Sequence, residues 1–384
     1  MHICYLCSEY PPAPHGGIGT FVQTTARALV GRGHHVTVIG FNDVDLPAKE
    51  DDAGVQVQRL PRARIPTMGF FLNGFRLRSL LKRVHRDYPI DVLEGQENAF
   101  AAFPRVFPAP RVIRMHGGHH FFQVTLGKRP RPWRGWLEKR SFKRAEHLCA
   151  VSSYVADTTR KLLGLDKRNI EVIPNPVDTD KVKPLSGVAT VPGRIVFVGT
   201  VCEKKGVRQL IQAMPAVISK VPEAHLHIVG PDWKDRETGA SYIKGLQNEI
   251  SPELEAHIRF LGRIANSEIP VILASAEVLA YPSHMEAMPL VWLEGMAARK
   301  PVVASTLGPG PEVIEDGVDG LLCNPLDPDS IAQALTRALS DAGLRETLSA
   351  NARTRAVQSY SINRLVDRNL EYYEACARHG RRGS

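Results

Sequence analysis

Residues 281–294 read YPSHMEAMPLVWLE, which combines a strand end, a polar loop and a helix start in immediate succession. An apolar run ends at Pro282, and the polar loop that follows contains Glu286. We expect the helix to begin near Pro289, because the fixed φ of proline suits the first helical position. Glu294 then lies in the second turn of that helix, eight residues after Glu286.

This arrangement predicts an anion site with two acids beside it. Free backbone N–H groups in the first helical turn, around Leu290, would attract an anion. Glu286 and Glu294 would then accept hydrogen bonds from sugar hydroxyl groups. The alternative is a solvated loop acid and an ordinary helix-face acid, which occur at this spacing by chance. Predicted strands before the loop and at residues 300–305 favour a site, because open α/β folds bind ligands at the carboxyl edge of a parallel sheet.

The length and composition predict a two-domain globular protein. A chain of 384 residues is long for one domain, and a hydrophobic content of 43% allows two cores. The chain has no apolar run of about eighteen residues, so no membrane-spanning helix is expected. Its start, MHICYLCSEY, lacks the features of a secretory signal. Cys4 and Cys7 have no second pair, so we interpret them as buried cysteines of a reducing, cytoplasmic protein.

The positive charge is concentrated in the first half of the chain. Residues 1–180 contain 26 Lys and Arg against 17 Asp and Glu, whereas residues 181–384 contain 23 of each. Residues 128–144, KRPRPWRGWLEKRSFKR, place Trp133 and Trp136 among basic side chains. No nucleic-acid-binding motif accompanies them, so nucleic acid is the weakest interpretation. A solvated basic face and a peripheral contact with an anionic membrane stay open as alternatives.

The beginning of the chain predicts a βαβ unit with a glycine loop. A strand at residues 2–8 precedes a proline-rich loop with Gly16 and Gly17, and a helix at 21–32 and a strand at 35–41 follow. Glycines let the backbone approach a ligand, and the helix start would attract an anion. A third glycine at the spacing of a dinucleotide site is absent. A glycine turn without a ligand is the alternative.

A histidine follows a later predicted strand. The strand at residues 111–115 runs into His116, Gly117, Gly118, His119 and His120. His116 is the residue that a parallel strand would deliver to the ligand edge. Histidines in such a cluster could bind a metal ion, but His119 and His120 are adjacent rather than at helical spacing and no acid lies nearby in sequence. We therefore favour a polar loop for His119 and His120.

The second half repeats the pattern of strand, loop and helix. The strand at residues 194–198 is followed by GTVCEKKG and a helix at 207–217. Lys205, between strand end and helix start, could neutralise a diphosphate; a surface lysine in a basic turn is the alternative. Three D-x-D triplets, at 43–45, 178–180 and 327–329, lie apart from the other motifs. We therefore expect no required metal ion and no cofactor.

The stretch EAMPLVWLE resembles the E-x7-E signature of family 4 glycosyltransferases. HGGIGT, MHGG, NPVD, GTVCEKKG and GPGPEVIEDGVDGLL follow that family's order over nearly the whole chain. The resemblance implies an α/β protein of the GT-B class, with two Rossmann-like domains facing across a cleft. The implied parts are an acceptor-binding domain at residues 1–183, a nucleotide-sugar donor domain at 190–360, and a helix at 361–384 that crosses back to the first domain.

The family also implies an activity: a hexose-type sugar moves from a UDP- or GDP-sugar to a glycan, lipid-linked or small-molecule acceptor, with retained configuration. Lys205 would bind the diphosphate, Glu286 the sugar and Glu294 the ribose, while His116 would lie near the reacting carbon. The sequence departs from the family at Thr200, where arginine is usual. Further donor contacts implied by the resemblance are Gly16, Gly17, Gly199, Thr200, Arg263, Ile264, Met288, Pro289 and Leu290.

Two other classes of protein share these features. A nucleotide-sugar 2-epimerase on the same fold would need acid and base groups but no acceptor. A non-catalytic nucleotide-sugar-binding protein would need neither catalytic acid and base groups nor an acceptor. Only Thr200 favours this interpretation. Because Lys205, Glu286 and Glu294 are all present, we favour the transferase.

Overall fold

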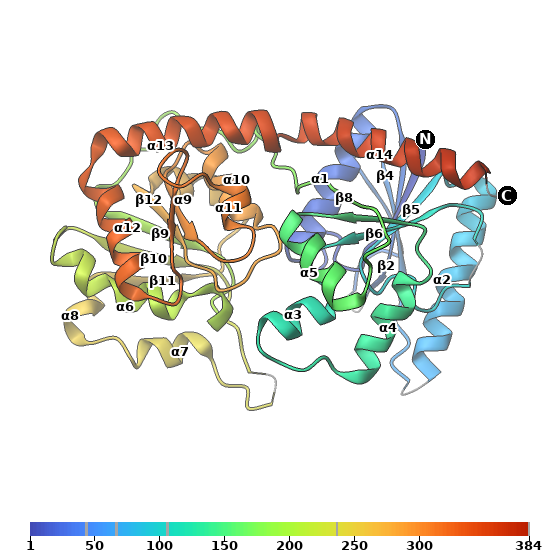
Figure 1. Cartoon of the computed structure of the whole chain (residues 1–384), viewed down its shortest axis with the longest axis horizontal. Helices are drawn as coiled ribbons and strands as arrows, with labels where there is room; N and C mark the ends of the chain where they lie inside the picture. The colour runs from blue at the N-terminus through green and yellow to red at the C-terminus, as the bar shows by residue number, and fades with distance from the viewer. Residues whose placement is uncertain (43–44, 66–67, 105–106, 236, 383–384) are drawn as a thin grey trace. The chain divides into compact units, whose positions relative to one another are not determined.

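A computed structural model describes the chain except for residues 43–44, 66–67, 105–106, 236 and 383–384, and the side chains of 379–382. The chain divides into two compact units, Met1–Pro176 with Ile362–Ser384 and Val177–Ser361. Each unit has its own largely parallel sheet with helices packed on it, which confirms the predicted α/β fold class (Figure 1). Residues 177–183 group with the second unit, where the Arg353 guanidinium donates hydrogen bonds to backbone carbonyls of this segment.

The sheet of the first unit has the order β3-β4-β2-β1-β5-β6-β7-β8. Neighbouring strands are parallel except for the antiparallel pair β3 and β4. The strand order reverses between β1 and β5, and such a reversal opens a crevice at the carboxyl ends of the strands. The strands are β1 His2–Leu6, β2 His35–Asn42, β3 Lys49–Asp52, β4 Val55–Pro61, β5 Val92–Gly95, β6 Arg111–Met115, β7 His147–Ala150 and β8 Ile170–Val172.

The helices of this unit follow local signals in the sequence. The Ser152 side chain caps α5 by accepting a hydrogen bond from the Val155 N–H at 3.2 Å. Gly164 ends the same helix with a φ of 65°, a conformation that glycine adopts without strain. The helices are α1 Gly17–Gly31, α2 Met68–Asp87, α3 His119–Thr125, α4 Pro132–Phe142, α5 Ser153–Leu163 and α14 Ile362–Arg382.

The last helix, α14, belongs to the core of the first unit. It lies beside α1 in Figure 1, and its apolar side chains join the core cluster that also contains Phe21 of α1. A buried polar network fixes it: the Arg114 guanidinium binds Glu94 at 2.8 Å and Asn369 at 2.5 Å. The Tyr373 hydroxyl donates to Glu94 at 2.8 Å. A segment from the end of the chain is thus needed to complete the first core.

The sheet of the second unit has the order β11-β10-β9-β12-β13-β14, and its strand pairs are all parallel among the described residues. The order reverses between β9 and β12. The strands are β9 Arg194–Val198, β10 His225–Val229, β11 Ile258–Gly262, β12 Val278–Tyr281, β13 Val302–Ser305 and β14 Leu321–Cys323. The helices are α6 Val207–Ile218, α7 Tyr242–Gln247, α8 Pro252–Glu255, α9 Ile269–Ser275, α10 Leu290–Ala297, α11 Gly310–Val313, α12 Pro328–Ser340 and α13 Ala342–Arg355, with a 3₁₀ turn at Glu203–Lys205 and a π turn at Ala356–Tyr360.

Two boundaries differ from the sequence prediction. Pro289 is the N-cap of α10 rather than its first residue, since its ψ of 112° is extended. Helix α1 begins at Gly17, four residues before the predicted start, because glycines tolerate a helical first turn as well as a loop. No helix in the described part of the chain is long and apolar enough to cross a membrane.

Candidate functional site

Lys205 and Glu286 meet at the strand-order reversal of the second unit. Lys205 follows β9 in a 3₁₀ turn, and Glu286 lies in the loop after β12. The Lys205 ammonium donates a hydrogen bond to the Glu286 carboxylate, and the two side chains are 19% and 13% exposed. The structure therefore joins two residues that the sequence assigned to one site.

The two loops that hold this pair are fixed to each other. Gly206 has a φ of 68°, and a Cβ atom there would lie 1.8 Å from the Pro282 carbonyl oxygen, so the position has room only for glycine. The His284 N–H donates to the Lys204 carbonyl oxygen at 2.9 Å. These backbone contacts hold the strand-end loops at a constant spacing, which preorganises the charged pair.

Glu294 has unused hydrogen-bonding capacity. It is half-buried on α10, and its carboxylate makes no hydrogen bond or ion pair within the described residues. Burial raises the pKa of Glu294 from 4.5 to about 7. Its charge also acts on the hydroxyl group of Tyr281, which is buried and has no hydrogen-bond partner in the part of the chain that the structure describes. Polar groups left open in this way are typical of ligand sites.

The remaining residues predicted in the second unit lie along the same sheet edge. Gly199 and Thr200 follow β9 directly, and Arg263 and Ile264 follow β11, with β10 between the two strands. The backbones come close, since a Cβ on Gly230 would lie 1.9 Å from the Gly199 carbonyl oxygen. Met288, Pro289 and Leu290 form the start of α10.

The predicted residues of the first unit also share one sheet edge. Gly16 is the N-cap of α1 and Gly17 its first residue, while His116 follows the last residue of β6. The His116 ring lies 5.1 Å from the ring of Phe21, which is also on α1. Burial, with a smaller contribution from Arg114, lowers the pKa of His116 to about 3, so the ring is neutral at pH 7.

Two buried acids that we did not predict hold the His116 loop. Glu97 accepts a hydrogen bond from the His116 N–H at 2.6 Å. Burial raises the pKa of Glu97 to about 8, and the charge of Glu138 adds to the shift. Glu138 accepts a hydrogen bond from the His120 N–H at 2.9 Å and contacts the His120 ring. Hydrogen bonds to Glu97 and Glu138 therefore fix the backbone of the loop between β6 and α3 near both of its ends.

The prediction that His119 and His120 lie in a polar loop is wrong. Both residues begin α3, and His120 is 9% exposed because its ring pairs with Glu138. The acid is 18 residues away in sequence, so only the packing of α4 brings it to the histidine. One signal was present, since Glu138 is the single acid between residues 105 and 144.

Two of the D-x-D triplets serve local structure. The Asp178 carboxylate accepts the Lys181 N–H at 3.0 Å, and Asp327 caps α12 by accepting the Asp329 N–H at 3.0 Å. The first residue of the third triplet, Asp43, lies outside the described residues. Within the described residues, no group of three His, Cys, Asp or Glu side chains could hold a metal ion.

Two parallel-sheet units, each with its predicted residues at a carboxyl edge, have the architecture of the GT-B fold. Residues 192–341 match the family model Glycosyl transferases group 1, and residues 15–181 match the model Glycosyltransferase Family 4. The chain thus belongs to the family 4 glycosyltransferases.

A relative agrees with this assignment, and solved structures share the fold. An uncharacterised glycosyltransferase of Methanocaldococcus jannaschii is 27% identical over 97% of this chain and 98% of its own length. The sucrose-phosphate synthase structure from Thermosynechococcus elongatus has a TM-score of 0.83 at 21% identity and covers 98% of both chains. The Anabaena HepE structure in complex with UDP-glucose has a TM-score of 0.74 at 22% identity, over 98% of this chain and all of its own. These likenesses in structure concern the fold.

Proposed function

We propose that this glycosyltransferase moves a hexose-type sugar from a UDP- or GDP-sugar to an acceptor hydroxyl group, with retained anomeric configuration. The observation that carries the proposal is the contact between Lys205 and Glu286 at the strand-order reversal of the second unit. That position is where doubly wound sheets bind nucleotides. The UDP-glucose in the Anabaena structure supports the donor class.

The negative charge that develops on the departing diphosphate determines the role of Lys205. When the bond between the anomeric carbon and the phosphate oxygen breaks, its electron pair stays on that oxygen. Lys205 and the N–H groups at the start of α10 would stabilise this charge, because preorganised charges and dipoles act strongly in a water-poor site. The glycines that open α1 would supply a second set of N–H groups. Thr200 would contribute a hydroxyl contact where arginine is usual in the family.

Other residues would hold the sugar and the ribose. Glu286 would accept hydrogen bonds from sugar hydroxyl groups, and Glu294 from the ribose. His116 is neutral, so its ring can accept a hydrogen bond near the reacting carbon. The acceptor oxygen forms the new bond to that carbon, and its proton passes to the departing diphosphate. We assign no carboxylate nucleophile, because Glu286 and Glu294 are assigned to the sugar hydroxyls and the ribose, whereas retaining hydrolases use acids that flank the scissile bond.

Transfer would need no metal ion in this proposal, because Lys205 supplies positive charge to the diphosphate. The carboxylates of Asp178 and Asp327 are engaged in turn and cap contacts, so their triplets are poor candidates for metal ligands. Activity measured after dialysis against a chelator should equal activity with added Mg²⁺ or Mn²⁺. If the chelator abolishes activity and added Mg²⁺ or Mn²⁺ restores it, the proposal that transfer needs no metal ion is refuted.

The test of the main proposal has three readouts. A panel of UDP- and GDP-sugars should include one that raises the melting temperature, and only that donor should support transfer to an acceptor. Proton NMR of the product should show the donor's anomeric configuration. Release of a changed sugar without any acceptor would instead indicate an epimerase. Donor binding with no product from any acceptor would indicate a binding protein.

We also propose that the first unit docks on an anionic membrane surface through residues 128–144 and the neighbouring α2. Trp133 and Trp136 are 56% and 47% exposed and stack at 5.1 Å. Phe71 and Phe75 on α2 are 72% and 67% exposed. We call Phe71, Phe75, Trp133 and Trp136 the aromatic face. Exposed aromatic rings beside basic residues suit the headgroup level of a bilayer.

Vesicle binding tests this second proposal. The protein should sediment with phosphatidylglycerol vesicles at low salt and less at high salt, because screening weakens attraction to anionic lipid. Replacing Trp133 and Trp136 by alanine should reduce binding at least about fivefold. Trp233 of the second unit is 44% exposed, so Trp233→Ala is a matched control that should bind normally. No sedimentation at low salt would reject membrane docking.

A further inference from the structure

A cavity of about 430 Å³ lies within the first unit at its strand-order reversal. Its walls come from β1 and β2 near their carboxyl ends, from the segments that follow β1, β4 and β5, from one face of α2, and from Leu137 of α4. The volume is within the range of about 300–1,000 Å³ that small-molecule sites occupy. The roles assigned above to nucleotide-sugar binding do not use this cavity.

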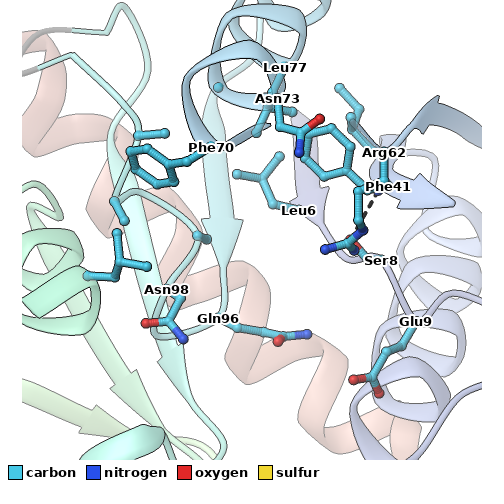
Figure 2. A pocket seen from close by; sticks show the side chains of 17 residues that line it. Leu6, Ser8, Glu9, Phe41, Arg62, Phe70, Asn73, Leu77, Gln96 and Asn98 are labelled. Carbon is cyan, nitrogen blue, oxygen red and sulfur yellow. Dashed lines mark hydrogen bonds between the residues drawn. The ribbon is translucent and has the colours of Figure 1, made fainter. Parts of the chain in front are cut away.

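The cavity has two chemically different sides (Figure 2). Glu9, Gln96 and Asn98 lie together on one side, and Phe70 and Leu77 lie on the other. Asn73 is also on the second side, but its amide group is hydrogen-bonded to the backbone of Ala63 at 2.8 and 3.1 Å. Arg62 on that side lies over the Phe41 ring at 5.6 Å. Apart from the positive charge of the Arg62 guanidinium, the second side is therefore mostly apolar toward a ligand.

The polar side lies next to two segments of the first unit that we predicted to contact the donor: the glycine loop at Gly16 and the loop at His116. The Glu9 carboxylate accepts a hydrogen bond from the Gly16 N–H at 3.3 Å. Gln96 and Asn98 flank Glu97, which accepts the His116 N–H at 2.6 Å. A hydroxyl group bound at this end would thus lie beside the glycine loop and the histidine.

The apolar side connects to the aromatic face. The ring of Phe70, which lines the cavity, contacts the Trp133 ring at 5.9 Å. Leu137 of α4 also lines the cavity, one residue after the exposed Trp136. Arg134, an exposed residue of α4 that follows Trp133 in sequence, adds positive charge to this helix. The surface next to the apolar side thus suits an anionic lipid layer.

We infer that this cavity binds the acceptor and that the acceptor is an amphiphile. A sugar or polyol head would hydrogen-bond to Glu9, Gln96 and Asn98, and a hydrocarbon chain would pass Phe70 and Leu77 toward the aromatic face. The inference rests on the proposed glycosyl transfer and narrows its acceptor to a lipid-linked hydroxyl compound. The reacting oxygen is the head-group hydroxyl, whose bond to the anomeric carbon replaces the bond to the diphosphate.

Calorimetric titration with n-octyl β-D-glucoside below its micelle concentration tests the inference, with no nucleotide sugar present. The glucoside should bind the full-length protein at least about tenfold more tightly than glucose, because chain burial adds favourable free energy. Phe70→Ala should weaken glucoside binding at least about fivefold. Val124 on α3 is 42% exposed and belongs neither to the cavity lining nor to the aromatic face, so Val124→Ala is the control and should bind normally.

A filling variant separates lost binding from lost folding. Ala102 lines the cavity, and Ala102→Met should weaken glucoside binding by occupying the space while the melting temperature stays near the wild-type value. Equal affinity for glucose and octyl glucoside, or normal binding by both Phe70→Ala and Ala102→Met, would overturn the inference. Donor binding is measured separately by the melting shift with the nucleotide sugar. If no nucleotide sugar raises the melting temperature, the proposed function is refuted. If Phe70→Ala and Ala102→Met leave glucoside affinity unchanged, only the inference of an amphiphilic acceptor is refuted.

Discussion

The Lys205 ammonium and the Glu286 carboxylate are bonded in the folded second unit although 81 residues separate them in sequence. The pair forms where β9 and β12, the two central strands, end side by side. A cation held beside an acid at that edge can receive a diphosphate on one side and sugar hydroxyls on the other. Because both side chains are mostly buried, their mutual attraction is screened less than that of a surface pair.

Lys205→Met and Glu286→Gln should each lower kcat by about 10²–10³, because each removes preorganised stabilisation of the reacting groups. The two residues contact each other, so the double variant should lose less than the product of the single losses. Steady-state kinetics on the four proteins, with circular dichroism to verify folding, measures both effects. Near-normal kcat in either single variant would remove that residue from the mechanism.

Gly206→Ala should lower the melting temperature and weaken donor binding. A left-handed backbone costs an L-residue about 1–2 kcal/mol, and the new Cβ would also collide with the Pro282 carbonyl oxygen. Gly239 has a similar φ of 71° with nothing within 4 Å, so Gly239→Ala carries the backbone cost alone. Equal melting temperatures for the two variants would show that the loop contact at Gly206 is unimportant.

Glu97→Gln should flatten the pH dependence of stability between about pH 5 and 8. The folded state keeps the Glu97 proton up to a pKa of about 8, whereas the unfolded chain loses it near the ordinary value of 4.5. The wild-type free energy of unfolding therefore falls as pH rises through this window, and the glutamine variant lacks that loss.

Urea unfolding at pH 5, 6.5 and 8 measures this difference, which should amount to about 1–4 kcal/mol between the ends of the window. Glu346 has a side chain that is 69% exposed, so Glu346→Gln is the control and should follow the wild-type curve. Parallel curves for the wild type and Glu97→Gln would refute the raised pKa.

Arg114→Met should destabilise the first unit by about 3–5 kcal/mol, because it leaves Glu94 buried without its cation. It also removes the bond to Asn369 that helps to hold α14. The exposed pair of Arg86 and Asp87 provides the control, and Arg86→Met should change stability by no more than about 0.5 kcal/mol. Similar urea midpoints for the two variants would show that the buried network is dispensable.

Much of the fold was predictable from local patterns. The strand at residues 194–198 has the same bounds in the structure, and the helix predicted at 207–217 ends one residue later. The edge strand β3, with the sequence KEDD, was not predicted, because it has no apolar residue and forms only by pairing with β4. Strand propensity alone does not mark such a segment.

Site residues that directly follow a strand could be predicted from the sequence. Residues that other parts of the chain bring to the site by packing could not. Lys205, Glu286 and His116 each come directly after a recognisable strand or its loop. Glu138 comes from a helix that the sequence suggested only as a basic stretch, so its bond to His120 could not be foreseen. Likewise the two sides of the cavity combine residues from helices, strands and loops that are far apart in sequence.

The sequence by itself determined the alternation of strands, loops and helices, the glycine turns and the residues placed at strand ends. These features depend on the residue's own backbone preference and on hydrophobic spacing over a few positions. Only the tertiary structure decided which strand ends are neighbours, which acid meets which base, and that α14 completes the first core. Those outcomes depend on burying whole faces together, and a buried charge finds its partner only after the surrounding core has packed.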